Sequence, residues 1–171
     1  RRDGVTPEAL AKLLREQSGD STEWPSDETF HEAWRTQHAY QVLSNPKIVH
    51  ILKRLSDTYI TGKSEPLVVE GALTVEHILP QQWQERWPLP DGSKGLTDEA
   101  IWSAAKDDPR VGASRKRKQL LQTFGNLTIL TQALNSSVSN SQWTLKKPQL
   151  LKHSLLSINQ QLHDADVWDE A

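Results

Sequence analysis

The chain has 171 residues, of which 36% are hydrophobic, a size that supports one or two domains with a buried core. It has no cysteine, which excludes disulfide bonds and zinc sites built on thiolates. No apolar run approaches the roughly 20 residues needed to span a bilayer, and no secretory signal pattern opens the sequence, so we expect no membrane contact. The chain also lacks methionine and begins with Arg1, so we interpret it as a piece of a longer protein.

The net charge of −2 hides an uneven distribution of charged residues. Residues 109–163 contain none of the 22 acidic residues. The same stretch carries eight basic residues, which are Arg110, Arg115, Lys116, Arg117, Lys118, Lys146, Lys147 and Lys152. A long segment of one sign in a nearly neutral protein is typical of a surface that binds a polyanion. The alternative is a solvated helix surface, which fits the run from Arg115 to Lys118 equally well when that run is taken alone.

Residues 1–62 are predicted to form a helical N-terminal region packed on the rest of the chain. Thr6 and Pro7 suit the start of its first helix, as cap and first helical residue. A second helix follows, and a third is expected after Asn45-Pro46, because apolar residues then recur at intervals of three and four. The histidines of this region lack the spacing of metal ligands, so we interpret them as surface or interface residues: His31, His38 and His50.

Residues 63–163 are predicted to form the core of the domain, with a loop and helices inserted at 81–124. Short strands are expected at 67–69 and 73–75, and the second strand leads directly to Glu76 and His77. The elements expected further on are a helix over 97–106, a basic helix capped by Ser114 and ending at Phe124, a strand over 126–130, a helix from Gln132 and a long helix after Pro148. Residues 164–171 are expected to be a frayed acidic tail.

Four polar residues form the candidate site: Glu76, His77, Asn126 and Asn135. In phosphodiester hydrolysis, a neutral histidine can take the proton of the attacking water, and a divalent cation can polarise the phosphate. Mg²⁺ prefers oxygen ligands, which Glu76 and the carboxamide of Asn135 would supply. The Asn126 carboxamide could hydrogen-bond the backbone beside His77 and fix the imidazole. Adjacent strand residues point to opposite faces, so the turn at Pro80 must twist the backbone if Glu76 and His77 are to share a site.

Each candidate residue also has a plainer interpretation. A Glu-His pair is commonly surface decoration, because two-residue motifs occur by chance. Asn126, next to Gly125, could simply end a helix, and Asn135 could be an ordinary polar residue of a helix. Taken as an ordered set on strand, strand and helix, however, the residues favour a nuclease site.

Two stretches carry a resemblance to a known family: Glu76-His77-Ile78-Leu79-Pro80, and Gly125-Asn126-Leu127-Thr128-Ile129-Leu130 with Asn135 and Ser139-Asn140. They resemble the HNH or His-Me finger nucleases, and most closely the C-terminal nuclease domain of GmrSD-type restriction proteins, including relatives that sense phosphorothioate-modified DNA. The resemblance covers roughly residues 20 to 155. It implies a mainly helical α+β fold, in which a ββα-metal core carries added helices at both ends.

The resemblance also implies roles for the candidate residues. His77 corresponds to the general base, Asn126 to the residue that positions the catalytic loop, and Glu76 and Asn135 to the ligands of Mg²⁺ or Mn²⁺. Asn140 is the second candidate for a metal or phosphate contact. The pattern departs from the family in two respects: the last metal-ligand position is asparagine where histidine is more common, and 49 positions separate His77 from Asn126.

The expected function is that of a metal-dependent DNA endonuclease or nickase in a bacterial anti-phage restriction system, located in the cytoplasm. Its expected partners are DNA, from phage or carrying a modification, and an N-terminal sensor domain of the same protein whose Asp-Gly-Gln-Gln-Arg motif is absent from this chain. The residues predicted to contact DNA are Arg115, Lys116, Arg117, Lys118, Lys146 and Lys147. Two alternatives are a DNA-binding module with a degenerate nuclease site, and a helical protein-interaction domain anchored by the tryptophans.

Overall fold

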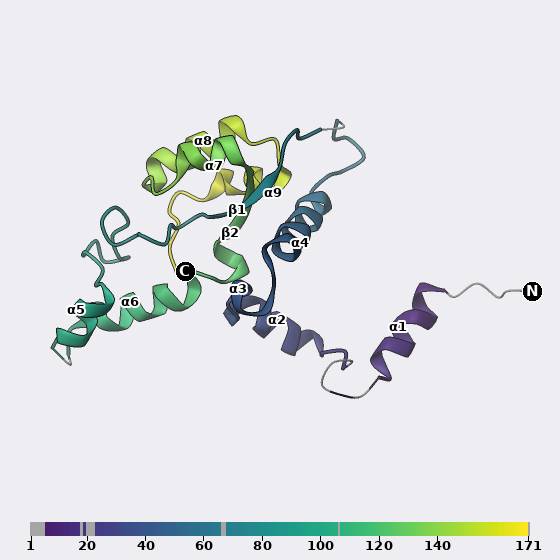
Figure 1. The fold of residues 1–171 in the computed structure, drawn as a ribbon, viewed down its shortest axis with the longest axis horizontal. Coiled ribbons are helices and arrows are strands. Elements are labelled where there is room, and N and C mark those ends of the chain that lie inside the picture. The colour runs from purple at the N-terminus through teal and green to yellow at the C-terminus, as the bar shows by residue number, and fades with distance from the viewer. Residues whose placement is uncertain (1–5, 18, 20–22, 66–67, 106, 171) are drawn as a thin grey trace, which may run out of the picture. The chain divides into compact units, whose positions relative to one another are not determined.

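The computed structural model describes residues 6–170, apart from residues 18, 20–22, 66–67 and 106. Its helices and strands follow in chain order (Figure 1). They are α1 (Pro7–Arg15), α2 (Asp27–Thr36), α3 (Ala39–Val42), α4 (Asn45–Thr58), β1 (Leu73–His77), α5 (Asp98–Ser103), α6 (Pro109–Leu120), the 3₁₀ turn η1 (Phe124–Asn126), β2 (Leu127–Thr131), α7 (Gln132–Val138), α8 (Trp143–His153), α9 (Ser157–Gln160) and η2 (Gln161–Asp164). This content of helices and strands confirms the prediction of a mainly helical α+β protein.

The chain divides into two compact units, Arg1–Trp34 and Arg35–Ala171. In the first unit, α1 begins as its sequence predicts, because the Thr6 side chain accepts a hydrogen bond from the Ala9 amide at 3.2 Å. The second unit contains α3, α4 and every later element, and therefore all the candidate site residues. Among the described helices, none is both long enough and apolar enough to cross a membrane.

The centre of the second unit is a sheet in which β1 and β2 pair antiparallel. The register places Glu76 opposite Thr128 and His77 opposite Leu127. Helix α7 follows β2 without a loop, so the order of elements around the sheet is strand, strand, helix. The predicted strand at 67–69 is wrong for Val68 and Val69, which are unpaired with either strand, and Leu67 lies outside the described residues.

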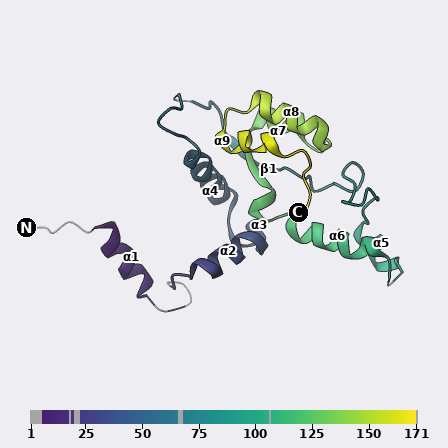
Figure 2. The ribbon, with the colours of Figure 1, turned by 180° about the vertical axis from the view of Figure 1, so that it is seen from behind.

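Helices cover both faces of this sheet. Figures 1 and 2 show α4 on one side of the strands and α7 with α8 on the other. Leu73 and Val75 of β1 pack in the cluster that contains Ile48 and Leu52 of α4. Leu130 of β2 belongs to the second cluster, which reaches α7 and α8. The alternation of a strand therefore places Thr74 and Glu76 on the α7–α8 face, and Val75 and His77 on the α4 face.

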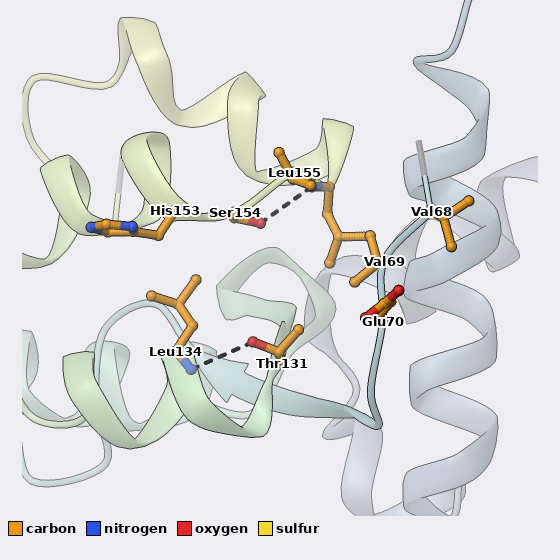
Figure 3. Close-up of a pocket in the computed structure, with 9 residues that line it drawn as sticks. Val68, Val69, Glu70, Thr131, Leu134, His153, Ser154 and Leu155 are labelled. Carbon is orange, nitrogen blue, oxygen red and sulfur yellow. Dashed lines mark hydrogen bonds between the residues drawn. The ribbon is translucent and has the colours of Figure 1, made fainter. Parts of the chain in front are cut away.

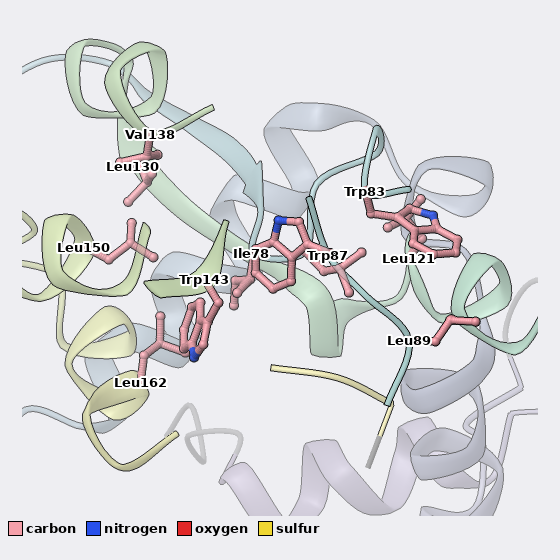
Figure 4. Close-up of a cluster of buried hydrophobic side chains, with 11 residues drawn as sticks. Ile78, Trp83, Trp87, Leu89, Leu121, Leu130, Val138, Trp143, Leu150 and Leu162 are labelled. Carbon is pink, nitrogen blue, oxygen red and sulfur yellow. The ribbon is translucent and has the colours of Figure 1, made fainter. Parts of the chain in front are cut away.

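The cluster on the α7–α8 face is rich in tryptophan (Figure 4). Trp83, Trp87 and Trp143 are buried, and each indole N–H that is buried needs an acceptor. Trp87 donates to the Ser141 carbonyl at 3.1 Å, and Trp143 donates to the Ala165 and Asp166 carbonyls at the same distance. These bonds fasten the inserted loop and the C-terminal segment to the helices around the sheet.

Three further sequence predictions in this unit are wrong, each for a local reason. Ser114 does not cap the basic helix: α6 begins earlier, where Asp108 caps it and Pro109 occupies its first turn. The Ser114 hydroxyl is buried inside α6 and accepts from the Leu96 amide at 3.0 Å. Pro148 lies within α8 and does not precede a helix. The C-terminal segment is packed and not frayed, as the bonds to Ala165 and Asp166 show.

Candidate active site

Glu76 lies on the α7–α8 face of β1 and is ion-paired with Lys146 of α8. Their side chains are only 13% and 0% exposed, and the Lys146 Nζ lies 2.5 Å from Glu76 Oε1. The same ammonium donates to the carbonyls of His77 at 2.7 Å and of Ser139 at 2.9 Å. Because a lysine ammonium has three donors, these three acceptors satisfy it completely. Burial lowers the pKa of Lys146, and the negative charge of Glu76 works against this shift.

Asn135 approaches the same face of β1 from α7. Its side-chain amide donates to Thr74 Oγ1 at 2.9 Å and to the Val75 carbonyl at 3.4 Å. Because its nitrogen is held by the strand, its carbonyl oxygen is the atom that remains to serve as a ligand. Thr74 and Glu76 share a face, so the structure brings Asn135 and Glu76 to one side of the sheet. Asn140 lies beyond α7, and its amide is 3.5 Å from Gln82 Oε1.

His77 is buried at the end of β1, on the α4 face, where its ring contacts uncharged side chains. Its Nε2 lies 2.8 Å from Gln122 Oε1, an amide oxygen that can only accept. Nε2 therefore carries the ring proton, and Nδ1 is the atom free to act as a base. Burial lowers the pKa of His77, while the Gln122 hydrogen bond and the charge of Glu76 raise it. The net direction is downward, which favours the neutral imidazole that a general base requires.

Two residues beside His77 were missed by the sequence analysis, namely Gln122 and Tyr40. The Tyr40 ring stacks on the imidazole with 5.8 Å between centroids and an interplanar angle of 21°. Burial, followed by the nearby charge of Glu76, raises the pKa of Tyr40. The negative charge of Glu76 thus acts on Tyr40, whose ring contacts His77. An electrostatic effect therefore extends from one face of β1 to the other at the end of the strand. No local pattern in the sequence marks either residue, because both contacts join distant segments.

Asn126 fastens the backbone that follows His77. Its own carbonyl accepts from the Ile78 amide at 2.9 Å. Its side chain accepts from the Leu79 amide and donates to the Leu79 carbonyl, both at 2.8 Å, and it donates to the Leu121 carbonyl at 3.0 Å. This is the backbone contact that the sequence analysis expected of a carboxamide here. The twist that the sequence analysis expected at Pro80 is absent from β1: regular pairing continues through His77, so the Glu76 and His77 side chains lie on opposite faces of the strand.

The C-terminal segment also reaches Asn126. The Trp168 indole donates to Asn126 Oδ1 at 3.1 Å, and the ring packs on Trp143. Glu170 forms an ion pair with Arg117 of α6, and both side chains are buried. The segment predicted to be a free acidic tail is therefore part of the structure that holds the site.

Two of the residues predicted to contact DNA, Arg117 and Lys146, are buried, so the predicted DNA surface is wrong at these two positions. The Arg117 guanidinium lies over the Trp83 ring, 4.7 Å from its centroid, and donates to the carbonyls of Trp87 and Pro88. Arg117 and Lys146 are 2% and 0% exposed, so neither presents its charge to a DNA phosphate. Arg115, Lys116 and Lys118 of α6 are exposed, although Lys118 contacts Asp98 at 2.6 Å. Lys147 is largely covered and donates to the Ala165 carbonyl at 2.9 Å.

The donor set agrees with a hard divalent cation held weakly. Glu76 and Asn135 supply two oxygens, and among the described residues no group of three or more histidine, cysteine or acidic side chains could hold a metal ion. Two protein oxygens suit Mg²⁺, which keeps several waters and takes others of its ligands from substrate phosphates. They do not suit zinc, which requires three or four protein ligands. Lys146 opposes binding, because it already neutralises Glu76.

A separate cavity of about 320 Å³ opens between the segment before β1 and the connection from α8 to α9 (Figure 3). It is lined by Val68, Val69, Glu70, Thr131, Leu134, His153, Ser154, Leu155 and Leu156. None of the predicted catalytic or metal-binding residues lines it. The candidate site residues at the end of β1 therefore lie outside this cavity.

Comparison with known families places the chain among nucleases of the restriction type. Residues 24–171 match the family described as GmrSD restriction endonucleases, C-terminal domain, and because this match covers most of the chain, the chain belongs to that family. The membership confirms the resemblance found in the sequence motifs. No curated protein and no solved structure shows significant similarity to the chain.

Proposed function

We propose that this domain is a Mg²⁺- or Mn²⁺-dependent DNA endonuclease or nickase of the HNH type, whose site lies at the end of β1. The observation that supports this proposal most strongly is the contact between the two motifs. Asn126 holds the backbone directly after Glu76 and His77, although 49 positions separate His77 from Asn126. A general base needs a fixed position, and this contact supplies it.

In the proposed reaction, His77 Nδ1 takes the proton of the attacking water while Gln122 keeps the other ring nitrogen protonated. Asn126 keeps the backbone after His77 in place. Glu76 and the Asn135 carbonyl oxygen would hold the divalent cation. When bound, this cation would polarise the scissile phosphate and stabilise the leaving oxygen. Asn140 remains the second candidate for a metal or phosphate contact.

Substrate binding is proposed to use the exposed cations of α6. Arg115, Lys116 and Lys118 precede Gln122 by a few residues, so the helix that carries them leads to the residue that contacts His77. Lysine and arginine contacts to phosphates position a duplex without reading its sequence. We therefore propose that selection of phage or modified DNA belongs to an N-terminal sensor domain of the same protein, in a bacterial cytoplasmic defence system.

The experiment is conversion of supercoiled plasmid by this domain, with Mg²⁺ or with chelator. The expected result is nicked or linear plasmid with Mg²⁺, no conversion with chelator, and conversion slowed by about 10²–10⁴-fold in a folded His77→Ala variant. Equal conversion by wild type and His77→Ala would contradict the proposal, because it would indicate a contaminating nuclease or another site.

A second candidate function is DNA binding without cleavage. The observation that favours it is the Lys146 ion pair, which neutralises the carboxylate proposed to bind metal. This alternative predicts retention of DNA without conversion of plasmid at any Mg²⁺ or Mn²⁺ concentration. The same plasmid assay, run beside a gel-shift measurement, separates the two functions.

A further inference from the structure

Lys146 is built into the candidate site far more firmly than an accidental ion pair would be. Its side chain is 0% exposed, and its three donors reach Glu76 Oε1, the His77 carbonyl and the Ser139 carbonyl. These acceptors come from the end of β1 and from the segment between α7 and α8. The ammonium therefore joins the strand that carries both candidate catalytic groups to the end of the helix that carries Asn135.

The backbone at Ser139 is shaped to meet this ammonium. Ser139 has a φ of 26°, a conformation that residues other than glycine rarely adopt. Such backbone conformations persist where surrounding contacts hold them, and the Lys146 hydrogen bond to the Ser139 carbonyl is such a contact. Lys146 thus contacts a strained carbonyl on one side and a candidate metal ligand on the other.

The charges leave the site without the net negative charge that attracts a cation. Glu76 contributes one negative charge, Lys146 contributes one positive charge, and Asn135 is neutral. Lys146 cannot turn away into solvent, because its side chain is fully buried on α8 between the sheet and the segment after α7. Any divalent cation that binds Glu76 must therefore do so beside a fixed positive charge, and like charges at this range repel strongly when they are shielded from water.

We propose that Lys146 is the internal counter-ion of Glu76 and competes with a divalent cation for this carboxylate, so that the free domain binds the cation weakly. This inference rests on the proposed role of Glu76 as a metal ligand. A phosphate of bound DNA adds negative charge to the same place and offsets the lysine. The site thereby becomes competent for metal when substrate is present, while Lys146 keeps Glu76 aligned in its absence.

The test is Mn²⁺ binding to the DNA-free domain, measured from the electron paramagnetic resonance signal of free Mn²⁺. Lys146→Met removes the charge and keeps most of the buried stem. The expected result is an affinity for Mn²⁺ at least about tenfold higher than that of the wild type, because the repulsion is gone. Lys152→Met is the matched control, since it removes one charge from an exposed position of the same helix, and its affinity should equal that of the wild type.

Unchanged or weaker Mn²⁺ binding by folded Lys146→Met would overturn the inference. So would an equal gain in Lys152→Met, which would show that the effect comes from the overall charge. A further variant, Lys146→Met with Glu76→Gln, should lose the gain, because the carboxylate that receives the cation is absent. A gain that survives in this double variant would place the cation elsewhere and would also contradict the inference.

A second measurement needs no substitution, in case Lys146→Met does not fold. In the wild-type domain, the buried ammonium should give a slowly exchanging ¹H–¹⁵N signal, and Mg²⁺ should shift it, as the Glu76 contact weakens, at lower concentration when a duplex that cannot be cleaved is bound than when the domain is free. A signal that stays unchanged when Mg²⁺ is added to the duplex-bound domain would overturn the inference while the proposed nuclease function stands. Loss of plasmid cleavage under all conditions is the separate result that would remove the proposed function itself.

Discussion

The two faces of β1 offer opposite environments to neighbouring residues of one motif. On the α7–α8 face, Glu76 is paired with a fully buried lysine. On the α4 face, His77 lies between the ring of Tyr40 and the amide of Gln122, both uncharged. The Glu76 carboxylate and the His77 imidazole thus contact different side chains, although the two residues are adjacent in sequence.

This difference matches the two roles proposed for the strand. The carboxylate proposed to bind a metal lies beside a buried ammonium, which is its counter-charge. An imidazole intended as a base must stay neutral, and burial beside neutral groups favours this by lowering the pKa of His77. The comparison predicts that substitutions on the His77 face act mainly on chemistry, whereas substitutions on the Glu76 face have the larger effect on folding.

Replacing His77 should have the largest effect on activity. His77→Ala should lower the rate of plasmid cleavage by about 10²–10⁴-fold, the usual contribution of a positioned acid–base group. DNA affinity should change little, whereas the melting temperature should fall, because His77→Ala removes a buried ring that stacks on Tyr40. His50→Ala, an exposed histidine of α4, is the control. A folded His77→Ala protein that cuts at the wild-type rate would remove His77 from the mechanism.

Breaking the ion pair on the other face should have the largest effect on stability. Glu76→Gln leaves a buried ammonium without its counter-charge, and losing one partner of a buried pair costs about 3–5 kcal/mol. Combining Glu76→Gln with Lys146→Met should recover part of this stability, because no isolated charge then remains. Urea unfolding of the two single variants and the double variant measures the coupling. Additive destabilisation would mean that the pair contributes no coupling energy.

Removing the Asn126 side chain should affect stability by a similar amount. Asn126→Ala would leave the buried amide and carbonyl of Leu79 without the partners that the side chain provides, at a cost of about 1–3 kcal/mol for each unsatisfied group. Cleavage should fall as well, since the backbone after His77 is released. Asn140→Ala is the matched control, because that amide makes only a 3.5 Å contact with Gln82 among the hydrogen bonds described for it. Equal unfolding free energies for the two variants would contradict the role given to Asn126.

Replacing exposed cations of α6 should have the smallest effect, confined to DNA binding. Arg115 and Lys118 lie three positions apart, on neighbouring parts of the helix surface. Replacing both with alanine should weaken binding to unrelated duplexes equally and reduce the slope of log affinity against log salt by about 0.9 for each phosphate that is no longer neutralised. Lys152→Ala serves as the comparison on α8. An unchanged slope would place the DNA surface away from α6, and weaker binding to one duplex alone would show that the helix reads bases.

Much of the candidate site could be predicted from the sequence because its residues carry local signals. Glu76 and His77 end a run of strand-forming residues, and Asn135 lies one turn into a helix that follows a strand, as the structure has it. Both strands, which pair antiparallel in the structure, are marked in the sequence by strand-forming residues. Such signals do not depend on what the rest of the chain contacts.

The parts that sequence could not reveal depend on contacts between distant segments. Lysine is usually exposed, so composition alone assigned Lys146 to a DNA surface. A usable signal did exist, because Trp143, Lys146 and Leu150 recur at helical intervals and all three are buried on one face of α8. The C-terminal segment was misjudged for a similar reason: its acidic residues suggested solvent, but Glu170 has a buried partner in Arg117.

The most direct test of the central claim, that both faces of β1 serve one reaction, is a double-variant cycle on the cleavage rate. His77→Ala represents one face and Asn135→Ala the other, since Asn135 can be removed without leaving Lys146 unpaired. If the two residues act as a unit, the combined variant should be about as slow as the slower single variant at saturating Mg²⁺. If their effects multiply instead, or if Asn135→Ala cuts at the wild-type rate at every Mg²⁺ concentration, the two faces do not share one reaction.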